Sequence, residues 1–597
     1  MIATAGHVDH GKSTLVRALT GMEPDRWAEE RRRGMTIDLG FAWTQVPTGQ
    51  ASAETVAFVD VPGHQRFLAN MLAGVGPVPA VLLVVAADEG WARQTAEHVA
   101  ALDALGVAHG VLAVTRSDLA DPWDATRQVL DRLAGTSLAG LPAVSVSGAT
   151  GQGLEELRTA LGELVRSLPE PTTGGRVRLW VDRTFTVKGA GCVVTATLGA
   201  GTVHVGDQLQ LLPSGRSVGV RGLQSLGEPA GSVSAVARVA VNLRGVSADE
   251  VARGDALETP GAEVLTTVVD ATLRRPAAER PLDELPQTCV LHVGSAAVSV
   301  HVRLLGPHSL RLTLERPLPL RRGEAAVLRD PGQQRVAAGL VIADVDPPGL
   351  HRRGAAAARA QALAAGVGVL DEVRRRGAPG LEQLERVGVL QPGQPLPSGL
   401  LAVGGAWVVT EQDWAGWGER LSAAVRQAAA DDPLSAGLSA DAARRAARIP
   451  AGVPMNALAA ARGLVVADGR LQLPAAGSVL PAPARAALDR LAEHLDGTPF
   501  AAPEADDLPR LGLTPAVVAA AARAGLLLRI GSPPVLLLPT AEDEAVRRLA
   551  ALPQPFTASQ ARQALGTTRR VAIPLLEHLD SRRRTRRDPA GARTVVR

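Results

Sequence analysis

The stretch Gly6-His-Val-Asp-His-Gly11-Lys12-Ser13 decides the fold of the N-terminal region, because it fits the phosphate-binding pattern GxxxxGK[ST]. An apolar run, Ile2–Ala5, precedes it and predicts a buried strand, while the residues from Ser13 onward predict a helix. Backbone N–H groups of such a loop wrap phosphate oxygens, and the helix N-terminus adds its positive end. We expect Lys12 to neutralise the β- and γ-phosphates and Ser13 to ligate Mg²⁺. The other nucleotide-binding candidates in this loop are Asp9, His10, Gly11 and Thr14.

The next predicted strand carries residues suited to a metal ion and to a terminal phosphate. The run Val56–Asp60 is apolar up to its final carboxylate, and a tight turn containing Gly63 follows it. A carboxylate such as Asp60 is a ligand that Mg²⁺ prefers, and a glycine lets the backbone approach a γ-phosphate closely. A further buried strand is predicted at Ala80–Ala86.

Two later strand ends are suited to reading a nucleotide base. The run Gly110–Thr115 leads into a loop with Asp118, whose carboxylate can accept hydrogen bonds from both N1–H and N2–H of guanine. Ser147 and Gly148 end another apolar run, and backbone N–H groups there are expected to meet guanine O6. Four such elements in this order predict an α/β domain that binds GTP and GDP. The remaining base-loop candidates are Thr115, Arg116 and Leu119.

With these motifs in place, the segment Asp25–Ala42 resembles the first switch of the Tu-like translational GTPases. The resemblance implies that Thr36 ligates Mg²⁺ and senses the γ-phosphate. It implies that His64 is the catalytic residue that orients the attacking water, since phosphoryl transfer depends mostly on placement and electrostatics. It also implies that Val8 and Met35 form the apolar gate that screens this water.

The base-reading loop departs from that family in two places. Arg116 stands where the family has a lysine, and we expect its planar guanidinium to stack across the base as the lysine stem does. Gly148 replaces the usual alanine, which is a mild change because only backbone is needed there. The arginine fits a bias of the whole chain: of 63 Lys plus Arg residues, only Lys12 and Lys188 are lysines.

Length and composition restrict the class of protein. At 597 residues the chain is long enough for several domains, and 46% hydrophobic with 21% charged residues excludes a largely disordered chain. Two cysteines, Cys192 and Cys289, can form neither a disulfide framework nor a four-cysteine zinc site. No uncharged apolar run approaches the ~18 residues of a membrane helix. We therefore expect a cytoplasmic protein with no signal peptide and no membrane contact.

Changes in pattern along the chain predict a multidomain architecture. An α/β P-loop GTPase domain is expected at residues 1–170, ending in a Pro/Gly linker, and short strands with Gly/Asp turns then predict two antiparallel β-barrels at 174–260 and 261–346. Lys188 falls in a predicted hairpin turn of the first barrel. Beyond Pro348, Ala-rich helices each lead into a short strand, the first being an apolar strand expected after Arg386, and the last three such ends recur about 60 residues apart. They predict a tandem array of winged-helix modules at 347–410, 411–475, 476–540 and 541–597.

The last module has the features of an RNA-binding element. From Phe556 to Arg597 ten arginines stand against three acidic residues, a net charge of about +7. Two predicted helices joined at Gly566 form a helix-turn-helix, with Arg569 and Arg570 on the first turn of the second helix. Cations there oppose the helix dipole unless an anion such as phosphate compensates them. The complete set of RNA-binding candidates is Arg562, Thr568, Arg569, Arg570, Arg582, Arg583, Arg584 and Arg586.

A Tu-like GTPase followed by winged-helix modules is similar to the selenocysteine-specific elongation factors. The resemblance implies a monomer that uses GTP/GDP and Mg²⁺ to deliver selenocysteinyl-tRNA to the ribosome at a recoded UGA codon. It also implies that the C-terminal modules bind the mRNA hairpin that marks this codon. Two alternatives stay open at this point: a general Tu-like elongation or initiation GTPase, and an RNA-binding regulator that uses GTP as a structural switch.

The same resemblance implies a pocket for the selenol. Because selenocysteine presents an anion where serine presents a neutral hydroxyl, the pocket should hold a cation, and an unpaired buried arginine would reject serine. Arg183, Arg238 and Arg244 lie on predicted strands similar to those that face the amino acid in the family. Any one of the three is a candidate.

Overall fold

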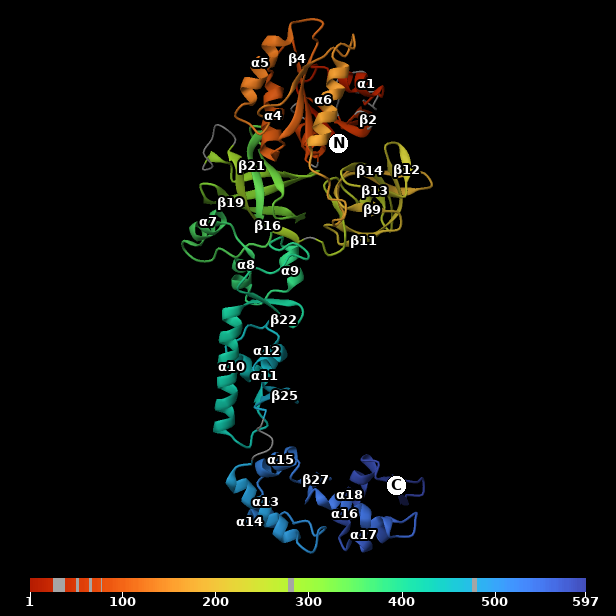
Figure 1. Cartoon of the computed structure of the whole chain (residues 1–597), viewed down its shortest axis with the longest axis vertical. Coiled ribbons are helices and arrows are strands. Elements are labelled where there is room, and N and C mark those ends of the chain that lie inside the picture. Colours follow the sequence, from red (N-terminus) through yellow and green to blue (C-terminus); the bar gives the residue numbers. More distant parts are fainter. Residues whose placement is uncertain are drawn as a thin grey trace. The chain divides into compact units, whose positions relative to one another are not determined.

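The computed structural model describes residues 1–24, 38–49, 53–63, 67–76, 78–262, 264–276, 284–474 and 480–596 (Figure 1). These residues form two compact units. One comprises Met1–Val369 with Glu382–Gln394, and the other comprises Leu370–Leu381 with Pro395–Arg597. The predicted first winged-helix module, residues 347–410, contributes to both units, so its boundaries stay a prediction.

The first domain is a six-stranded sheet covered by helices, in the order β2-β3-β1-β4-β5-β6. The inner strands are parallel and mostly apolar because helices cover both faces of the sheet, whereas β2 and β3 pair antiparallel. Alternate residues feed two cores: Ala3 and Leu83 face one, and Ile2 and Leu82 face the other. The strands are β1 (Ile2–Ala5), β2 (Gly40–Pro47), β3 (Ala53–Asp60), β4 (Ala80–Ala86), β5 (His109–Thr115) and β6 (Ala143–Ser145). The helices are α1 (Lys12–Thr20), α3 (Leu68–Val75), α4 (Arg93–Leu105), α5 (Pro122–Leu133) and α6 (Leu154–Ser167).

The first barrel is a seven-stranded antiparallel sheet, β10-β15-β7-β8-β14-β11-β12, that closes where β10 pairs with β11. Its interior is built from alternate valines and leucines, such as Val194 and Val241. Lys188 lies exposed in the turn between β7 and β8, as predicted. The strands of the sheet are β7 (Arg178–Val187), β8 (Gly191–Ala200), β10 (Gln208–Leu212), β11 (Arg216–Ser225), β12 (Glu228–Ala230), β14 (Ala237–Arg244) and β15 (Ala256–Glu258); β9 (Thr202–His204) pairs with β13 (Ser232–Ser234) beside it.

The second barrel is closed in the order β16-β19-β18-β17-β20-β21. Helix α7 (Ala355–Ala365) packs on its outer face around Leu305 and Leu363. Two antiparallel barrels therefore follow the nucleotide-binding domain, as the sequence predicts. The strands are β16 (Val264–Pro276), β17 (Thr288–Val293), β18 (Ala296–Gly306), β19 (Ser309–Leu320), β20 (Ala325–Asp330) and β21 (Arg335–Asp344).

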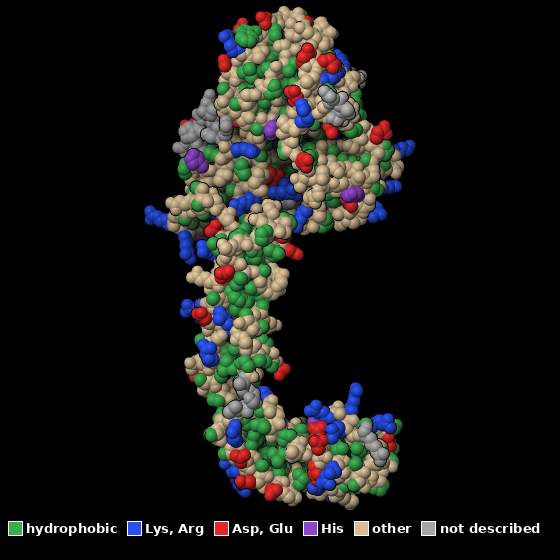
Figure 2. Space-filling view, in the orientation of Figure 1, with side chains coloured by type: hydrophobic (Ala, Val, Ile, Leu, Met, Phe, Trp, Pro, Cys, Tyr) green, Lys and Arg blue, Asp and Glu red, His purple; other side chains and the backbone are tan. Residues whose placement is uncertain are grey.

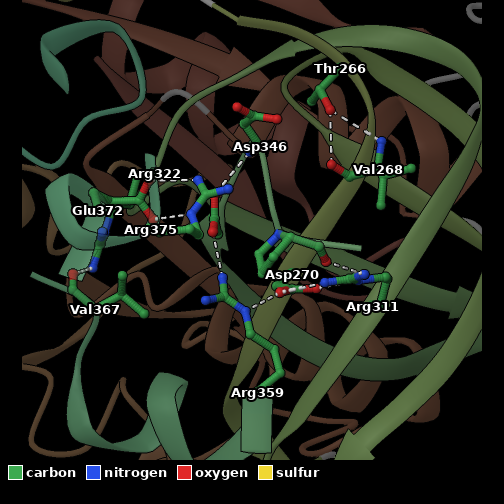
Figure 3. A network of polar contacts seen from close by, with 12 residues as sticks. Thr266, Val268, Asp270, Arg311, Arg322, Asp346, Arg359, Val367, Glu372 and Arg375 are labelled. Carbon is green, nitrogen blue, oxygen red and sulfur yellow. Dashed lines mark hydrogen bonds and ion pairs between the residues drawn. The ribbon is translucent and has the colours of Figure 1, made fainter. Parts of the chain in front are cut away.

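A buried ionic network attaches α7 to this barrel (Figure 3). The Arg359 guanidinium donates to Asp270 over 2.6 Å and also bonds Asp344, while Arg311 donates to the other Asp270 oxygen over 2.7 Å. All four side chains are less than a tenth exposed. Burying charges is costly unless each is paired and hydrogen-bonded, and the bidentate arginines meet that condition.

Beyond residue 410 three modules repeat one pattern, in which three helices precede a short antiparallel hairpin. This matches the predicted winged helices. Ahead of them lie α8 (Val369–Arg376), α9 (Leu381–Arg386), β22 (Leu400–Val403) and β23 (Trp407–Thr410). The first repeat has α10 (Glu411–Asp431), β24 (Leu438–Ser439), α11 (Ala440–Ala446), α12 (Met455–Ala461), β25 (Val465–Ala467) and β26 (Arg470–Gln472). The second has α13 (Ala482–Leu495), α14 (Asp507–Leu511), α15 (Pro515–Arg523), β27 (Leu528–Ile530) and β28 (Val535–Leu537), and the third has α16 (Thr540–Ala550), α17 (Ala558–Leu565), α18 (Arg569–Ser581), β29 (Thr585–Arg587) and β30 (Arg593–Val595).

Two features of this region differ from the sequence expectation. The run after Arg386 was expected to be an apolar strand, but residues 387–390 form a turn whose Val387 packs against the second barrel core. The last two modules also share a core: Phe500 of one and Phe556 of the other are buried in the same hydrophobic cluster.

Among the helices described, none has the length and apolar character needed to cross a membrane.

Candidate nucleotide site

The predicted nucleotide motifs meet at one edge of the sheet. Because β1, β3, β4, β5 and β6 run parallel, their carboxyl ends lie together, and the loops that follow them converge there. The phosphate-binding loop connects β1 to α1, Asp60 ends β3, Thr115 ends β5, and Ser147 lies just beyond β6. Residues far apart in sequence thus lie at the same edge of the sheet.

Asp60 is the buried acidic centre of this site. Its side chain accepts hydrogen bonds from Ser13 Oγ (2.6 Å) and from Thr4 Oγ1 (2.7 Å), and Thr4 in turn accepts one from the Val61 amide. The carboxylate has no solvent exposure. A hydroxyl and a carboxylate side by side form a donor set that fits Mg²⁺, which prefers hard oxygen ligands and retains several waters.

Lys12 points into the phosphate-binding loop. Its ammonium donates to the carbonyl oxygens of His7 (2.7 Å) and Gly6 (3.2 Å), and only 6% of the residue is exposed. Gly63 closes the other side of the loop: a Cβ added there would lie 2.7 Å from both Lys12 Nζ and the Val8 amide nitrogen. Only glycine therefore allows the two segments to approach as they do.

Two polar side chains of α4 hold the loop, and the motif analysis missed both. Gln94 Oε1 accepts a hydrogen bond from the Val8 amide (2.9 Å), and His98 Nδ1 accepts one from the Gly6 amide (3.1 Å). Burial lowers the pKa of His98 to about 3, so the ring stays neutral and can accept. The sequence does contain one indication of this role: Gln94 and His98 are four residues apart, a spacing that places both side chains on one face of a helix.

The base-reading loop is fastened to the phosphate-binding loop. Thr115 Oγ1 donates to the His10 carbonyl over 2.7 Å, while Asp118 and Leu119 are exposed and open to a ligand. His10 is itself fully buried, and burial lowers its pKa to about 4. Arg116 differs from the expectation that it stacks across the base. Its guanidinium bonds instead to the Asp9 carbonyl and to carboxylates beyond β4.

The last motif is a compact turn. Ser147 Oγ accepts from the Thr150 amide over 3.1 Å, and the Ser147 amide donates to the Gln152 carbonyl over 2.9 Å. We therefore expect the Gly148 amide, rather than that of Ser147, to face guanine O6. Gly148 also lies against Thr14 of α1, because a Cβ there would be 3.3 Å from the Thr14 methyl. Three predicted residues, Met35, Thr36 and His64, lie outside the described residues.

Two of the three arginines proposed for the amino-acid pocket share a second site. A cavity of about 200 Å³ between β2 of the first domain and the first barrel is lined by Phe41, Arg183 and Arg238. The Arg238 guanidinium lies 4.2 Å above the Phe41 ring, and that of Arg183 lies 5.9 Å from it. Arg244 ends β14 beside Gly219 and does not line this cavity.

The expectation of an unpaired arginine in this pocket is wrong. Arg238 forms a bidentate pair with Asp182 that is nearly buried, because β7 and β14 both flank β8 and bring the two residues together. Arg183 pairs with Asp38 at 3.0 Å and donates to the Leu39 carbonyl at 2.6 Å. The Arg183–Asp38 pair is about a quarter exposed on each side, so it is the weaker of the two pairs.

The C-terminal helix-turn-helix has the predicted geometry. Gly566 ends α17 in the left-handed conformation (φ 63°), and α18 begins with Arg569 and has Thr568 as its N-cap, without a side-chain cap bond. Arg569 and Arg570 are both exposed, and Arg570 also donates to the carbonyls of Ala502 (2.7 Å) and Pro503 (3.3 Å). Acidic and basic side chains alternate on the face of these modules seen in Figure 2. Of the other candidates, Arg582, Arg583 and Arg586 are exposed, Arg562 is half-buried, and Arg584 pairs with Asp543 at 2.6 Å.

Sequence and structure comparisons agree with this architecture. The model of the elongation factor Tu GTP binding domain matches residues 1–167, and that of the elongation factor SelB winged helix matches residues 547–591. The chain is 38% identical over 355 residues to the selenocysteine-specific elongation factor of Desulfomicrobium baculatum, which covers 57% of this chain and 55% of that relative. The chain thus matches little more than half the length of this relative.

Two further likenesses cover a larger share of the other protein. The crystal structure of a bacterial selenocysteine-specific elongation factor has the same fold over 100% of this chain and 99% of its own, with a TM-score of 0.78 at 24% identity. Elongation factor Tu 2 of Streptomyces avermitilis is 33% identical over 288 residues, which cover 44% of this chain and 73% of that factor. Together with a phosphate-binding loop, a hydrogen-bonded Ser13–Asp60 pair and two following barrels, this shows that the chain belongs to the elongation factor Tu family of translational GTPases.

Proposed function

We propose that this protein is a monomeric GTPase that carries selenocysteinyl-tRNA to the ribosome at a recoded UGA codon and binds an mRNA hairpin beside that codon. The observation that carries the proposal is the joining, in one chain, of a Tu-family GTP site and barrels to a helix-turn-helix module similar to the SelB winged helix. A general Tu-like factor has no use for such an array.

In this proposal the residues of the first domain divide the work on GTP. Lys12 and the loop amides bind the phosphates, while Ser13, Asp60 and Thr36 hold Mg²⁺, which neutralises the developing charge on the phosphates. His64 orients the attacking water behind the apolar gate of Val8 and Met35. Gln94 and His98 keep the phosphate-binding loop in place through its Val8 and Gly6 amides.

A binding experiment on the complete chain tests the proposal directly. With GTP present, selenocysteinyl-tRNA should bind much more tightly than the same tRNA charged with serine, and the mRNA hairpin should bind as well. Equal affinity for both aminoacyl-tRNAs would contradict the selenocysteine assignment. Binding of the hairpin without any GTP-dependent tRNA binding would favour an RNA-binding regulator.

The identity of the base is tested at Asp118. Asp118→Asn should weaken GTP binding by about ten- to a hundredfold, because a charge-assisted hydrogen bond contributes ~1.5–3 kcal/mol. The same variant should favour xanthosine triphosphate, whose C2 carbonyl accepts a hydrogen bond from the new amide. A titration with fluorescent nucleotides measures both effects, and unchanged GTP affinity would remove Asp118 from the site.

Amino-acid selection is tested at Arg183. Because its pair with Asp38 is partly exposed, Arg183 can exchange that carboxylate for a selenolate at little cost, while the buried Arg238–Asp182 pair stays intact. Arg183→Ala should reduce the preference for selenocysteinyl- over seryl-tRNA by about tenfold or more, the size of one charge-assisted bond. Arg244→Ala, outside the cavity, is the matched control. If Arg183→Ala and Arg244→Ala show the same preference for selenocysteinyl- over seryl-tRNA, Arg183 does not select the amino acid.

RNA binding is tested at Arg569. Since its side chain is exposed, Arg569→Ala in the complete chain should weaken hairpin binding and reduce the slope of log affinity against log salt by about one ion. Arg547→Ala is the matched control, because Arg547 is an equally exposed arginine of the same module that already pairs with Glu544. An unchanged salt slope in Arg569→Ala would place the RNA contact elsewhere.

A further inference from the structure

Two residues in neighbouring loops of the proposed nucleotide site have left-handed backbone. Asp9 in the phosphate-binding loop has φ 65°, and Arg116 in the base-reading loop has φ 55°. This conformation costs a non-glycine residue roughly 1–2 kcal/mol, so it persists only where surrounding contacts impose it. One such contact joins the two residues directly, because the Arg116 guanidinium donates to the Asp9 carbonyl.

The other amino group of Arg116 is held by two acidic side chains. Nη1 donates to both oxygens of Asp88 (2.8 and 3.1 Å) and to Glu89 Oε1 (2.9 Å). Asp88 and Glu89 follow β4, so they lie on a third loop at the same edge of the sheet. The second Glu89 oxygen lies 3.3 Å from Nε2 of His10, a residue of the phosphate-binding loop.

We propose that Asp88 and Glu89 are positioning residues of the nucleotide site, which orient Arg116 so that it holds the phosphate-binding loop and the base-reading loop in register. This inference rests on the proposed GTP site. A guanidinium donates in several fixed directions at once, whereas an ammonium is a single point charge. An arginine in place of the family's lysine can therefore bridge three loops, but only when carboxylates fix the orientation of its planar guanidinium.

The acidic pair is expected to act on nucleotide retention rather than on stability. The side chains of Arg116, Asp88 and Glu89 are 29%, 34% and 42% exposed, and ion pairs this exposed add little to the free energy of folding. The geometry of the two loops, by contrast, determines how well phosphates and base are bound together. Loss of the acidic pair should thus speed nucleotide dissociation while the thermal unfolding midpoint of the free protein changes little.

A double-mutant cycle on the complete chain tests this inference with fluorescent GDP. Asp88→Ala with Glu89→Ala should raise the Kd about tenfold, as expected for loss of a charge-assisted contact, and Arg116→Lys should do the same. Because all three residues act through one bridge, the combined variant should raise the Kd for GDP by no more than about tenfold. Independent effects would instead multiply to a roughly hundredfold increase. Asp88→Asn with Glu89→Gln retains acceptor oxygens and should fall between the wild type and the alanine variant.

The control is Asp124→Ala, which removes the exposed partner of Arg127 on α5 and should leave the Kd for GDP unchanged. A wild-type Kd in the Asp88→Ala/Glu89→Ala variant would overturn the inference, as would additive effects in the combined variant. If the wild-type chain binds neither GDP nor GTP, the proposed nucleotide site itself is overturned. If the wild-type chain binds GDP and the substitutions leave its Kd unchanged, only the role of the acidic pair is overturned.

Discussion

Replacing Lys12 by alanine is expected to weaken GTP and GDP binding by between roughly 30-fold and several thousand-fold, since removing one partner of a buried, hydrogen-bonded charge pair costs ~2–5 kcal/mol. The ammonium is enclosed by the phosphate-binding loop and by Gly63, so water cannot readily take its place beside the phosphates. A fluorescent-nucleotide titration gives the two dissociation constants.

The chain contains its own control for this experiment, because Lys188 is the second of its two lysines. Lys188 is exposed in the β7–β8 turn, and Lys188→Ala should leave nucleotide affinity as it is in the wild type. Equal loss of affinity in both variants would show that the effect comes from general charge rather than from the site. Wild-type affinity in Lys12→Ala would contradict the assignment of the phosphate-binding loop.

His64→Ala is expected to reduce ribosome-stimulated GTP hydrolysis by at least about 100-fold, the lower end for a positioned catalytic group. Nucleotide binding should stay close to that of the wild type, because His64 is proposed to contact the attacking water and not GTP. Single-turnover hydrolysis with ribosomes and a parallel nucleotide titration separate the two quantities. If His64→Ala loses binding and hydrolysis together, as Lys12→Ala should, the histidine has a structural role.

Much of the first domain could be predicted from the sequence because its motifs are local. The loop from Gly6 to Ser13 fits one pattern, and the apolar runs that end at Asp60 and Thr115 each predict a buried strand. Parallel strands place their carboxyl ends at one edge, so the meeting of these residues follows from strand order alone. The barrels and the helix-turn-helix were predictable for the same reason, since short strands and turn residues such as Gly566 are also local signals.

The contacts made by long, flexible side chains depended on tertiary structure. A sequence shows that Arg116 is an arginine, but not that its guanidinium lies within reach of Asp88, Glu89 and the Asp9 carbonyl rather than across a base. Likewise, Gln94 and His98 are ordinary helix residues until α4 packs beside the phosphate-binding loop.

Choices among equivalent residues were likewise decided only by the fold. Arg183, Arg238 and Arg244 were equal candidates in the sequence, and the barrel register places the first two over Phe41 and the third at the far end of β14. The same holds for Arg569 and Arg570, which are both exposed but of which Arg570 bonds the carbonyls of Ala502 and Pro503. Local sequence determines which backbone conformation forms, whereas pairing between distant charges depends on distances of a few ångströms that only the packed chain establishes.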